Sequence, residues 1–366
     1  MIIRWYLIKE VVKTFLAVFL VIFLILLSTQ LLRVLSAVSE GKITLDLLFV
    51  LLGLTNIQSM AMVFPVTLFL SIILALSRFY KDSEMIAMWA CGISPKTILG
   101  SLLPVIFIFV VIEMLFALHI SPWANGQMTK VRNHVKLNAD VDVLDSGRFN
   151  IFANGERVIY VENITDEGVL KHVFLRVRKG KNSSVVYADQ AYIKTDDVSG
   201  VRYIVFMQGR RYDGQPGSDN YRVISFKEYG VIVENKALKA IKYDLDEQSF
   251  NYLLEQENNI QATAEIQWRI SLVLSLFILA LLAIPISKSS PRKGRFAKVI
   301  PAILVYFLYS NMFGIAQKFV KKGEISPLIG VWWVHILFLL LFLYLFGQQM
   351  GWFSSKILAG KENNVP

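Results

Sequence analysis

The chain has 366 residues, of which 55% are hydrophobic and only 18% are charged. Soluble globular domains have about 45–50% apolar and about 25% charged residues. The apolar excess lies in long uncharged runs, so the composition excludes an ordinary soluble protein and predicts membrane spans. The formal net charge is +10, yet residues 121–268 are nearly neutral, with 19 Lys and Arg against 20 Asp and Glu. The basic excess therefore belongs to the membrane segments, which argues against nucleic-acid binding.

Six apolar segments are candidate transmembrane helices, because a helix needs roughly 17–25 residues to cross the hydrocarbon. They are Val11–Val34, Leu45–Leu76, Ile98–Ile120, Ile270–Ile286, Val299–Ala316 and Val331–Phe346. The fourth is at the lower limit, and we expect the sixth to extend to Met350. The second contains Asn56, Gln58, Ser59 and Pro65, which predicts a tilt, a kink or a part outside the lipid. The first lacks a small-residue cleavage site and is too long for a signal peptide, so we expect a retained span.

Lys and Arg are distributed unevenly between the two sides of these spans. With the N-terminus inside, the inner flanks hold Arg4, Lys9, Lys13, Arg78, Lys81, Lys96, Lys288, Arg292, Lys293, Arg295, Lys298, Lys356 and Lys361. The outer flanks hold Arg33, Lys42, Arg269, Lys318, Lys321 and Lys322. Because Lys and Arg are enriched in cytoplasmic loops, we expect both termini in the cytoplasm and residues 121–268 outside.

The section between the third and fourth spans has the pattern of a β domain. Short β-branched and aromatic runs, separated by turn-rich clusters, occur at Val158–Val161, Val173–Val177, Val185–Ile193, Tyr203–Met207, Tyr221–Phe226 and Val231–Glu234. This spacing predicts an antiparallel all-β domain, a sandwich or a jelly roll. We expect Ser249–Gln267 to be helical. The predicted fold is an α-helical membrane protein with six transmembrane helices, three plus three, and an inserted all-β, jelly-roll-like domain.

The corresponding domain boundaries are residues 1–120 for the first three spans, with a cytoplasmic helix at 82–91, and 121–268 for the β domain. Residues 269–350 hold the last three spans, and 351–366 form a cytoplasmic tail. The one cysteine, Cys91, cannot form an intramolecular disulfide, so the outer domain must fold by its core alone.

Motifs for catalysis, nucleotide binding and metal binding are absent from the sequence. No Gly-x-x-x-x-Gly-Lys-Ser/Thr loop occurs, so the chain cannot hold nucleotide phosphates in the P-loop manner. Its four histidines are scattered, and Asp140, Asp142 and Asp145 lack the Gly and terminal Glu of a calcium loop. We therefore expect no enzymatic activity, no cofactor and no metal. Glu113, inside the third span, is either functional or a protonated or paired carboxyl that helps helices pack.

The loop after the second span predicts a two-turn cytoplasmic helix. Asp82 or Ser83 can cap it, Glu84 suits its first turn, and Gly92 can end it. Ser94-Pro95 then begins the third span. Apart from Glu84 the helix is apolar on nearly every face, with Met85, Ile86, Met88 and Trp89. It lies either in the bilayer interface or in a groove of a cytoplasmic partner. In a groove, the Glu84 carboxylate needs an Arg or backbone N–H groups of that partner.

Several motifs are similar to those of a known family. They are Ser83-Glu84, Ala90-Cys91-Gly92-Ile93-Ser94, Gln208-Gly209-Arg210-Arg211-Tyr212-Asp213-Gly214, Gln267-Trp268-Arg269-Ile270, Pro285-Ile286-Ser287 and Pro291-Arg292-Lys293-Gly294-Arg295. Together with the topology they resemble the YjgP/YjgQ permeases, the transmembrane subunits of the lipopolysaccharide-exporting ABC transporter. The Ala-Cys-Gly triplet is more similar to one of the two paralogous branches of this family than to the other.

The resemblance implies a subunit of the Gram-negative inner membrane that moves lipopolysaccharide toward the outer membrane. The implied partners are an LptG-like paralogous permease, an LptB-like cytoplasmic ATPase dimer, and LptC-like and LptA-like periplasmic proteins. The lipid would pass from a cavity between the two sets of spans, those of the paired permeases, to a periplasmic β-jellyroll. The missing nucleotide loop agrees with a separate ATPase.

The candidate site residues follow from this reading. Glu84, Met85, Met88 and Trp89 would couple the chain to the ATPase. Arg33, Lys42, Lys318, Lys321 and Lys322, at the outer ends of the spans, would attract lipid phosphates. Arg211 would order the lipid path of the β domain or its contact with a partner. The alternative function is a membrane-anchored sensor or assembly scaffold whose β domain binds a periplasmic protein. A lipid-modifying enzyme ranks third because no catalytic cluster is visible.

Overall fold

The computed structural model describes residues 2–39, 43, 45–138, 146–152, 156–165, 168–179, 182–195, 202–215, 221–232, 244–256, 259–290, 294 and 296–352. The chain divides into two compact units, a helical unit and a β unit. The helical unit comprises Met1–Leu35, Leu48–Thr129 and Tyr243–Pro366, and the β unit comprises Ser36–Leu47 and Lys130–Lys242.

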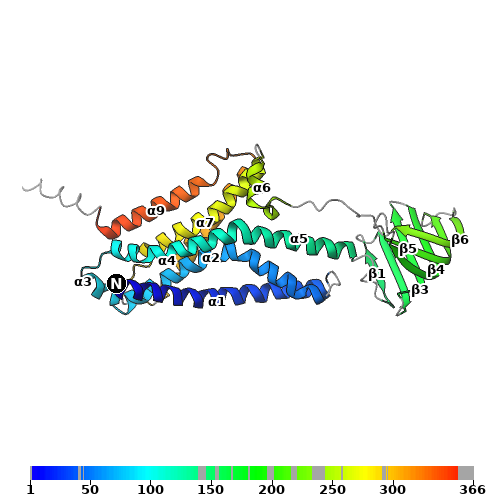
Figure 1. Cartoon of the computed structure of the whole chain (residues 1–366), viewed down its shortest axis with the longest axis horizontal. Helices are drawn as coiled ribbons and strands as arrows, with labels where there is room; N and C mark the ends of the chain where they lie inside the picture. Colours follow the sequence, from blue (N-terminus) through cyan, green and yellow to red (C-terminus); the bar gives the residue numbers. More distant parts are fainter. Residues whose placement is uncertain are drawn as a thin grey trace, which may run out of the picture. The chain divides into compact units, whose positions relative to one another are not determined.

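The described helices run in the order α1 (Ile2–Ser39), α2 (Leu48–Lys81), α3 (Glu84–Ala90), α4 (Pro95–Leu115), α5 (Ser121–Asn138), α6 (Phe250–Glu255), α7 (Ile260–Ile286), α8 (Val299–Lys321) and α9 (Trp332–Met350) (Figure 1). Short 3-10 turns, η1 (Leu45–Leu47) and η4 (Leu245–Glu247), precede α2 and α6. A π-helical turn, η2 (Phe116–Ile120), joins α4 directly to α5.

Among the described residues, six helices are long and apolar enough to cross a membrane, which confirms the three-plus-three arrangement. Each of them extends beyond its apolar run at one end or both. The third continues past Ile120 to Asn133, and the fourth begins at Ile260 instead of Ile270. Backbone hydrogen bonding carries a helix beyond its apolar stretch into polar flanks, so hydropathy marks the lipid-facing part and not the helix ends. Of the expected helix at Ser249–Gln267, the structure has α6 and the start of α7.

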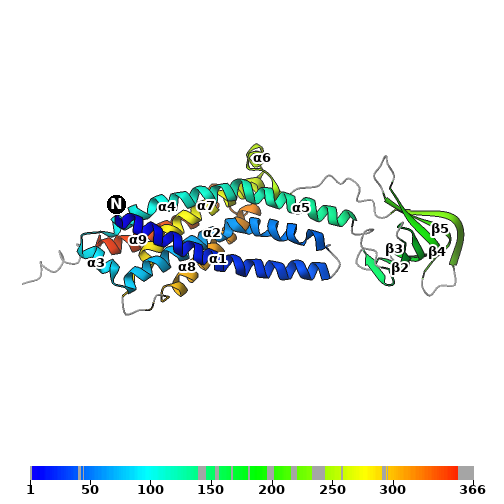
Figure 2. The same ribbon diagram turned by 60° about the horizontal axis from the view of Figure 1, so that its bottom comes forward.

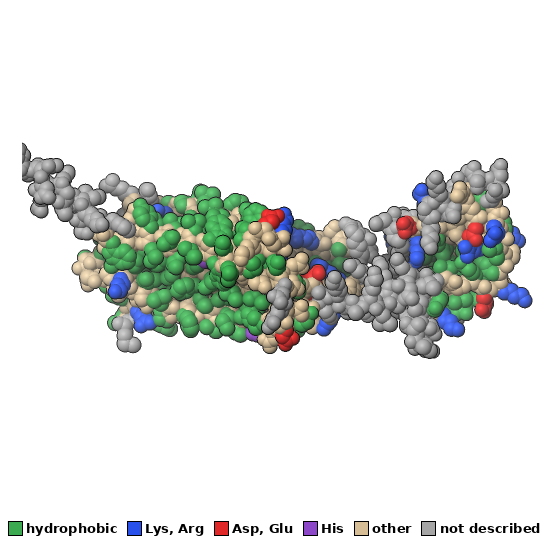
Figure 3. Space-filling view, turned by 90° about the horizontal axis from the view of Figure 1, so that it is seen from above, with side chains coloured by type: hydrophobic (Ala, Val, Ile, Leu, Met, Phe, Trp, Pro, Cys, Tyr) green, Lys and Arg blue, Asp and Glu red, His purple; other side chains and the backbone are tan. Residues whose placement is uncertain are grey.

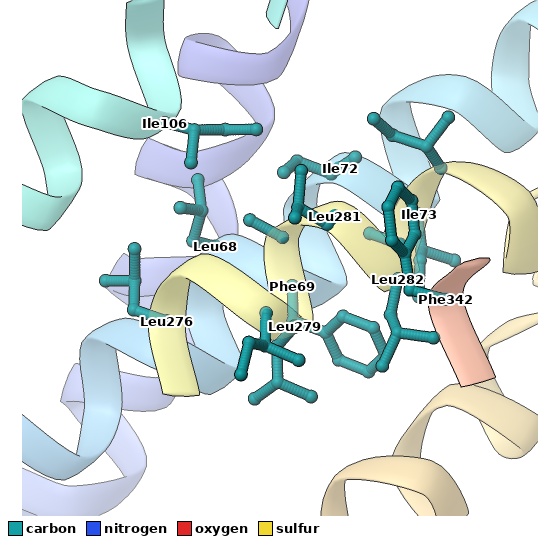
Figure 4. Packing of buried hydrophobic residues seen from close by; sticks show 14 of the residues in the cluster. Leu68, Phe69, Ile72, Ile73, Ile106, Leu276, Leu279, Leu281, Leu282 and Phe342 are labelled. Carbon is teal, nitrogen blue, oxygen red and sulfur yellow. The ribbon is translucent and has the colours of Figure 1, made fainter. Parts of the chain in front are cut away.

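Helices α2 and α7 form the centre of the helical unit. In their most apolar windows 67% and 72% of the residues are buried, against 17% in α1 and 22% in α8. Leu68 and Ile72 of α2 pack with Leu276, Leu279 and other α7 residues in the core (Figure 4). The face of the helical unit seen in Figure 3 is largely hydrophobic, and many large apolar side chains of α1, α4, α8 and α9 are exposed. Exposed apolar surface of this extent needs lipid or partner helices to cover it.

The β unit contains one described antiparallel sheet of β1 (Phe149–Phe152), β2 (Arg157–Ile164), β3 (Leu170–Lys179), β4 (Asn182–Thr195), β5 (Arg202–Gly214) and β6 (Tyr221–Ile232). The strands are paired in sequence order, so each is joined to the next as a hairpin. The inserted all-β domain is thus confirmed. Its described strands form a meander without the crossovers of a full jelly roll, and what resembles a jelly roll is the curvature of the sheet (Figure 2).

The curvature follows a bend row across strands β2 to β6, defined by Glu162, His172, Asp189, Gln208 and Lys227. Regular pairing skips these residues, and His172 and Gln208 have positive φ angles of 48° and 50°. In each of these strands, alternate side chains face inward, and this alternation shifts by one residue at the bend row. In β4, for example, the buried residues are Val186 and Ala188 before the row and Ala191 after it. The shift keeps apolar side chains on the inner face of a bent strand.

Gly209, next to this row in β5, has no room for a side chain. A Cβ there would lie 2.4 Å from the Tyr187 carbonyl oxygen and 2.5 Å from the ring of Phe226. Close approach of backbone and ring explains why the bend needs glycine at this position.

The orientation of the spans leads to a labelling prediction. In a Cys91→Ser chain, a membrane-impermeant maleimide should modify Lys171→Cys, an exposed position of β3, in intact spheroplasts. It should modify Lys288→Cys, after α7, only once the cells are lysed. The physical reason is the concentration of Lys and Arg in the loops expected to be cytoplasmic. Labelling of Lys288→Cys alone in intact spheroplasts would reverse the topology.

Candidate functional site

The end of the helical unit that carries α3 is here called the α3 end. Helix α3 forms as the sequence predicts: Gly92, at φ 83°, ends it, and Ser94 caps α4 through the Thr97 N–H with Pro95 in the first turn. Ser83 occupies the N-cap position, with φ 59°, but its side chain makes no capping hydrogen bond. The turn between α2 and α3 therefore depends on the left-handed backbone conformation of Ser83.

Three of the predicted coupling residues face the body of the helical unit. Met85 is buried, and Met88 and Trp89 are half-buried against its core. Trp89 meets the ring of Tyr80 edge-on, with centroids 5.7 Å apart. The opposite face of α3 exposes Ile86, Ala87, Ala90 and then Cys91. This outer face is therefore the apolar surface of α3 that a partner or the bilayer can contact. The sequence does not distinguish it from the face that packs against the helical unit.

Glu84 already has partners within its own chain. The Tyr6 hydroxyl of α1 donates a hydrogen bond of 2.8 Å to Glu84 Oε2, and Arg78 Nη2 of α2 lies 3.7 Å from Oε1. Its side chain is 35% exposed. The Glu84 carboxylate thus has partners without a cytoplasmic protein, because Tyr6, 78 residues away, becomes a neighbour in the folded chain. An Arg of the ATPase groove as its partner in the docked state stays a prediction.

At the opposite end of the spans, the candidate lipid-binding cations differ in their surroundings. Among the described residues, Arg33 and Lys318 are exposed and have no ion-pair partner. Lys321 lies 3.4 Å from Glu265, and Lys322 lies 3.7 Å from Glu324. Lys42 lies outside the described residues. Of the four described candidates, Arg33 and Lys318 are thus the two without a carboxylate partner among the described residues.

A cavity of about 660 Å³ opens beside Lys321. Its apolar wall comes from α2, η2 and α7, with Ala61, Met62, Ala117 and Leu272. Its polar rim includes Gln58, Ser121, Asn125, Asp244, Asp246, Gln261, Glu265, Arg269, Gln317 and Lys321. An apolar wall with a polar rim at the end of membrane spans suits an amphiphile.

Arg269 anchors the rim of this cavity. It is 2% exposed, and its Nε donates a hydrogen bond of 3.2 Å to Glu265 one turn earlier in α7. Its Nη1 donates to the carbonyl of Gln248 at 2.9 Å, and Nη2 to those of Leu245 and Asp246 at 3.1 and 3.2 Å. Arg269 therefore fastens the returning chain to α7. The sequence reading counted it only as a flanking charge.

The neighbours of Arg269 explain the Gln267-Trp268-Arg269 motif. Gln267 donates to the Pro327 carbonyl at 2.6 Å and packs against Gly330, where a Cβ would lie 2.5 Å from Gln267 Oε1. Trp268 stacks on Phe313 of α8 with centroids 4.3 Å apart. Consecutive residues of a helix point about 100° apart, so three neighbours fix α7 to three different segments.

Glu113 is fully buried in α4, just before η2. Neither carboxylate oxygen has a hydrogen-bond partner in the part of the chain that the structure describes. The paired carboxyl that would only help helices pack is therefore not found there. Burying an ionisable group at such a place is costly, so a functional role stays a hypothesis.

Arg211 links three strands on the inner face of the β sheet. It donates to Ser184 of β4 at 3.1 Å, to Asp213 of β5 at 2.8 Å and to the Tyr229 hydroxyl of β6 at 2.5 Å. The hydrogen bond to Asp213 raises the pKa of Arg211. Burial acts to raise the pKa of Asp213, but hydrogen bonds from Ser184 and Arg211 outweigh it and hold that pKa below its usual value. A contact of Arg211 with lipid or protein stays a prediction.

Comparison with known proteins adds an independent observation. The family model described as "Lipopolysaccharide export system permease LptF/LptG" matches residues 5–348. The chain belongs to the LptF/LptG permease family. It is 29% identical to the "Lipopolysaccharide export system permease protein LptF" of Escherichia coli (strain K12), over 344 residues that cover 93% of each chain. The LptF of Shigella flexneri matches with the same identity and coverage.

Membership in the LptF/LptG family confirms several expectations. The chain is a membrane subunit of a lipopolysaccharide export system, a multi-pass protein of the inner membrane and a permease. The similar proteins named above are LptF proteins, in agreement with the branch that the Ala90-Cys91-Gly92 triplet indicated.

Proposed function

We propose that this LptF/LptG-family chain withdraws lipopolysaccharide from the inner membrane and passes it to a periplasmic bridge. The observation that carries the proposal is the amphipathic cavity. Asn125 of α5, where the chain leaves for the β unit, and Asp244, where it returns, both lie on its rim. An amphiphile held there would touch the parts of the helical unit that precede Lys130 and follow Lys242 in the chain. Apolar side chains line the inner face of the β sheet.

The proposal includes a separate motor. The sequence has no P-loop, so ATP hydrolysis belongs to an LptB-like ATPase dimer. The exposed outer face of α3, with Ile86, Ala87 and Ala90, is its docking surface. An LptG-like permease would cover part of the apolar surface of α1 and α8. LptC-like and LptA-like proteins would receive the lipid outside the membrane.

Lipid phosphates are assigned first to Arg33 and Lys318, whose charges no described carboxylate neutralises. Arg33→Ala should lower the lipopolysaccharide retained by the purified complex roughly tenfold, the size of one charge-assisted contact. Assembly should be unchanged. Lys322→Ala is the matched control, because Lys322 is exposed but already paired with Glu324. Equal lipid retention by wild type and Arg33→Ala, measured by mass spectrometry, would remove Arg33 from the site.

The function itself is tested with the whole complex. After mild detergent extraction, mass spectrometry should find a cytoplasmic ATPase and a phosphorylated glycolipid with this chain. Reconstituted proteoliposomes should release lipopolysaccharide to a periplasmic acceptor only when ATP is present. Recovery of a periplasmic protein with neither ATPase nor glycolipid would instead support the sensor or scaffold.

A further inference from the structure

A network of polar side chains joins three helices at the α3 end. Arg78, near the end of α2, forms an ion pair with Glu10 of α1 and donates a hydrogen bond of 3.0 Å to the Tyr6 hydroxyl. Tyr6 in turn donates to Glu84 of α3 at 2.8 Å. Arg78 Nε also lies 3.6 Å from Asp82. One guanidinium and one phenol thus connect α1, α2 and α3.

The charges of this network do not balance. Among the ion pairs of the described residues at this end, one cation, Arg78, faces three carboxylates, those of Glu10, Asp82 and Glu84. Glu10 is the closest of the three, and the contact of Arg78 with Glu84 is the longest, at 3.7 Å. Glu84 is also partly exposed, at 35%. An added cation can therefore reach the Glu84 carboxylate and replace Arg78 as its ion-pair partner.

Helix α1 is held chiefly at this end. Its buried residues Leu7, Val11, Thr14 and Phe15 lie within its first half, and beyond them Gln30 is the only buried residue that the structure describes in α1. Gln30 is tied to α2 by one hydrogen bond, of 3.1 Å, to Ser59. A displacement applied near Tyr6 therefore moves a helix whose far half has few buried residues within its own chain to resist it.

We infer that Tyr6 and Arg78 are positioning residues that transmit movement of α3 to α1. When a cationic side chain of the ATPase binds Glu84, the hydrogen bond from Tyr6 is released or shifted, and the α3 end of α1 moves with the docking state of the motor. This inference rests on the proposed function, because it needs a motor at α3. It assigns coupling to α1 and α2 residues that the sequence motifs left out.

Tyr6→Phe tests the inference, because it removes the hydroxyl and leaves the ring, which packs 5.4 Å from Phe79. In the full complex in proteoliposomes, ATPase binding and ATP hydrolysis should be normal. Lipopolysaccharide released per ATP should fall roughly tenfold, as for loss of one hydrogen bond to a charged group. Tyr80→Phe is the matched control. It removes a hydroxyl at the same end that accepts from Gln349 of α9, and coupling should be unchanged.

The arrangement also predicts non-additive effects. Arg78→Gln should lower the coupling ratio as Tyr6→Phe does, and the double variant should be no worse than the more severe single variant, because both changes break the same connection. If the Tyr6→Phe chain itself does not accumulate as a folded protein, Arg78→Lys, which keeps the charge but not the forked geometry, provides the same measurement.

Several results would overturn the inference. They are equal coupling in Tyr6→Phe and Tyr80→Phe, additive losses in the double variant, or a loss of ATPase binding in Tyr6→Phe in proportion to lipid release. A wild-type complex that releases no lipopolysaccharide with ATP would instead overturn the proposed function.

Discussion

Glu84→Lys should abolish ATP-driven lipopolysaccharide release while the spans and the β unit stay folded. The substitution places an ammonium near Arg78, now 3.7 Å from the Glu84 carboxylate, and removes the acceptor of the Tyr6 hydroxyl. It also presents a positive charge to a motor surface that is expected to be cationic. Like charges juxtaposed at an interface cost several kcal/mol, which is enough to prevent docking. Glu84→Gln, which keeps the shape and an acceptor oxygen, should weaken coupling only partly.

The measurements are co-purification of the ATPase and lipid release in proteoliposomes. Glu324→Lys is the control, since it makes the same charge change at an exposed carboxylate that is paired with Lys322 at the other end of the spans. It should bind the motor normally. Normal assembly and transport by Glu84→Lys would place α3 at the bilayer surface and leave the motor to dock elsewhere.

Arg269→Met should cause the largest loss of stability in the helical unit. Arg269 is buried, and its side chain satisfies Glu265 and the carbonyls of Leu245, Asp246 and Gln248. Methionine fills similar space but leaves these acceptors without their donor. Breaking a buried ion pair by removing one partner costs about 3–5 kcal/mol. We expect a chain that accumulates poorly and whose α6 segment becomes accessible to protease.

Thermal unfolding in detergent, followed by tryptophan fluorescence, measures this effect, with Trp268 adjacent to the site. Lys321→Met is the matched control, because it removes the other cation beside Glu265 from a side chain that is 43% exposed. Exposed pairs contribute about 0.2–1 kcal/mol, so its unfolding temperature should change little. Equal stability of the two variants would show that the buried network does not fasten the returning chain.

The membrane architecture could be predicted from the sequence because the backbone of each span forms its hydrogen bonds within that span. A helix in lipid forms all its hydrogen bonds within one segment, so length and hydropathy suffice to locate it. The six runs found in this way, from Val11–Val34 to Val331–Phe346, each correspond to a helix. Gly92 and Ser94-Pro95 were equally readable, since left-handed φ and N-capping are local properties.

The β unit was predictable in type but less so in detail. The sequence pattern does not predict β1, and it predicts two strands, Tyr221–Phe226 and Val231–Glu234, where the structure has β6. The bend row explains the second error. Where the alternation of inward-facing side chains shifts by one residue within a strand, the sequence pattern is the same as for the end of one strand and the start of another.

The charged and polar contacts at both ends of the spans depended on tertiary structure. The sequence gives no sign that Tyr6 meets Glu84 or that Met85 is packed while Ile86 is exposed. Nor does it show that Lys321 is paired with Glu265 while Lys318 has no carboxylate partner in the part of the chain that the structure describes. The physical reason is range. Hydropathy and backbone propensity act within a few residues along the chain, whereas an ion pair or a buried donor needs two helices brought together by packing. Composition and local pattern therefore determined the membrane spans, the inserted β domain and the family. The packing of α1, α2, α3 and α7 decided which polar and charged side chains contact one another.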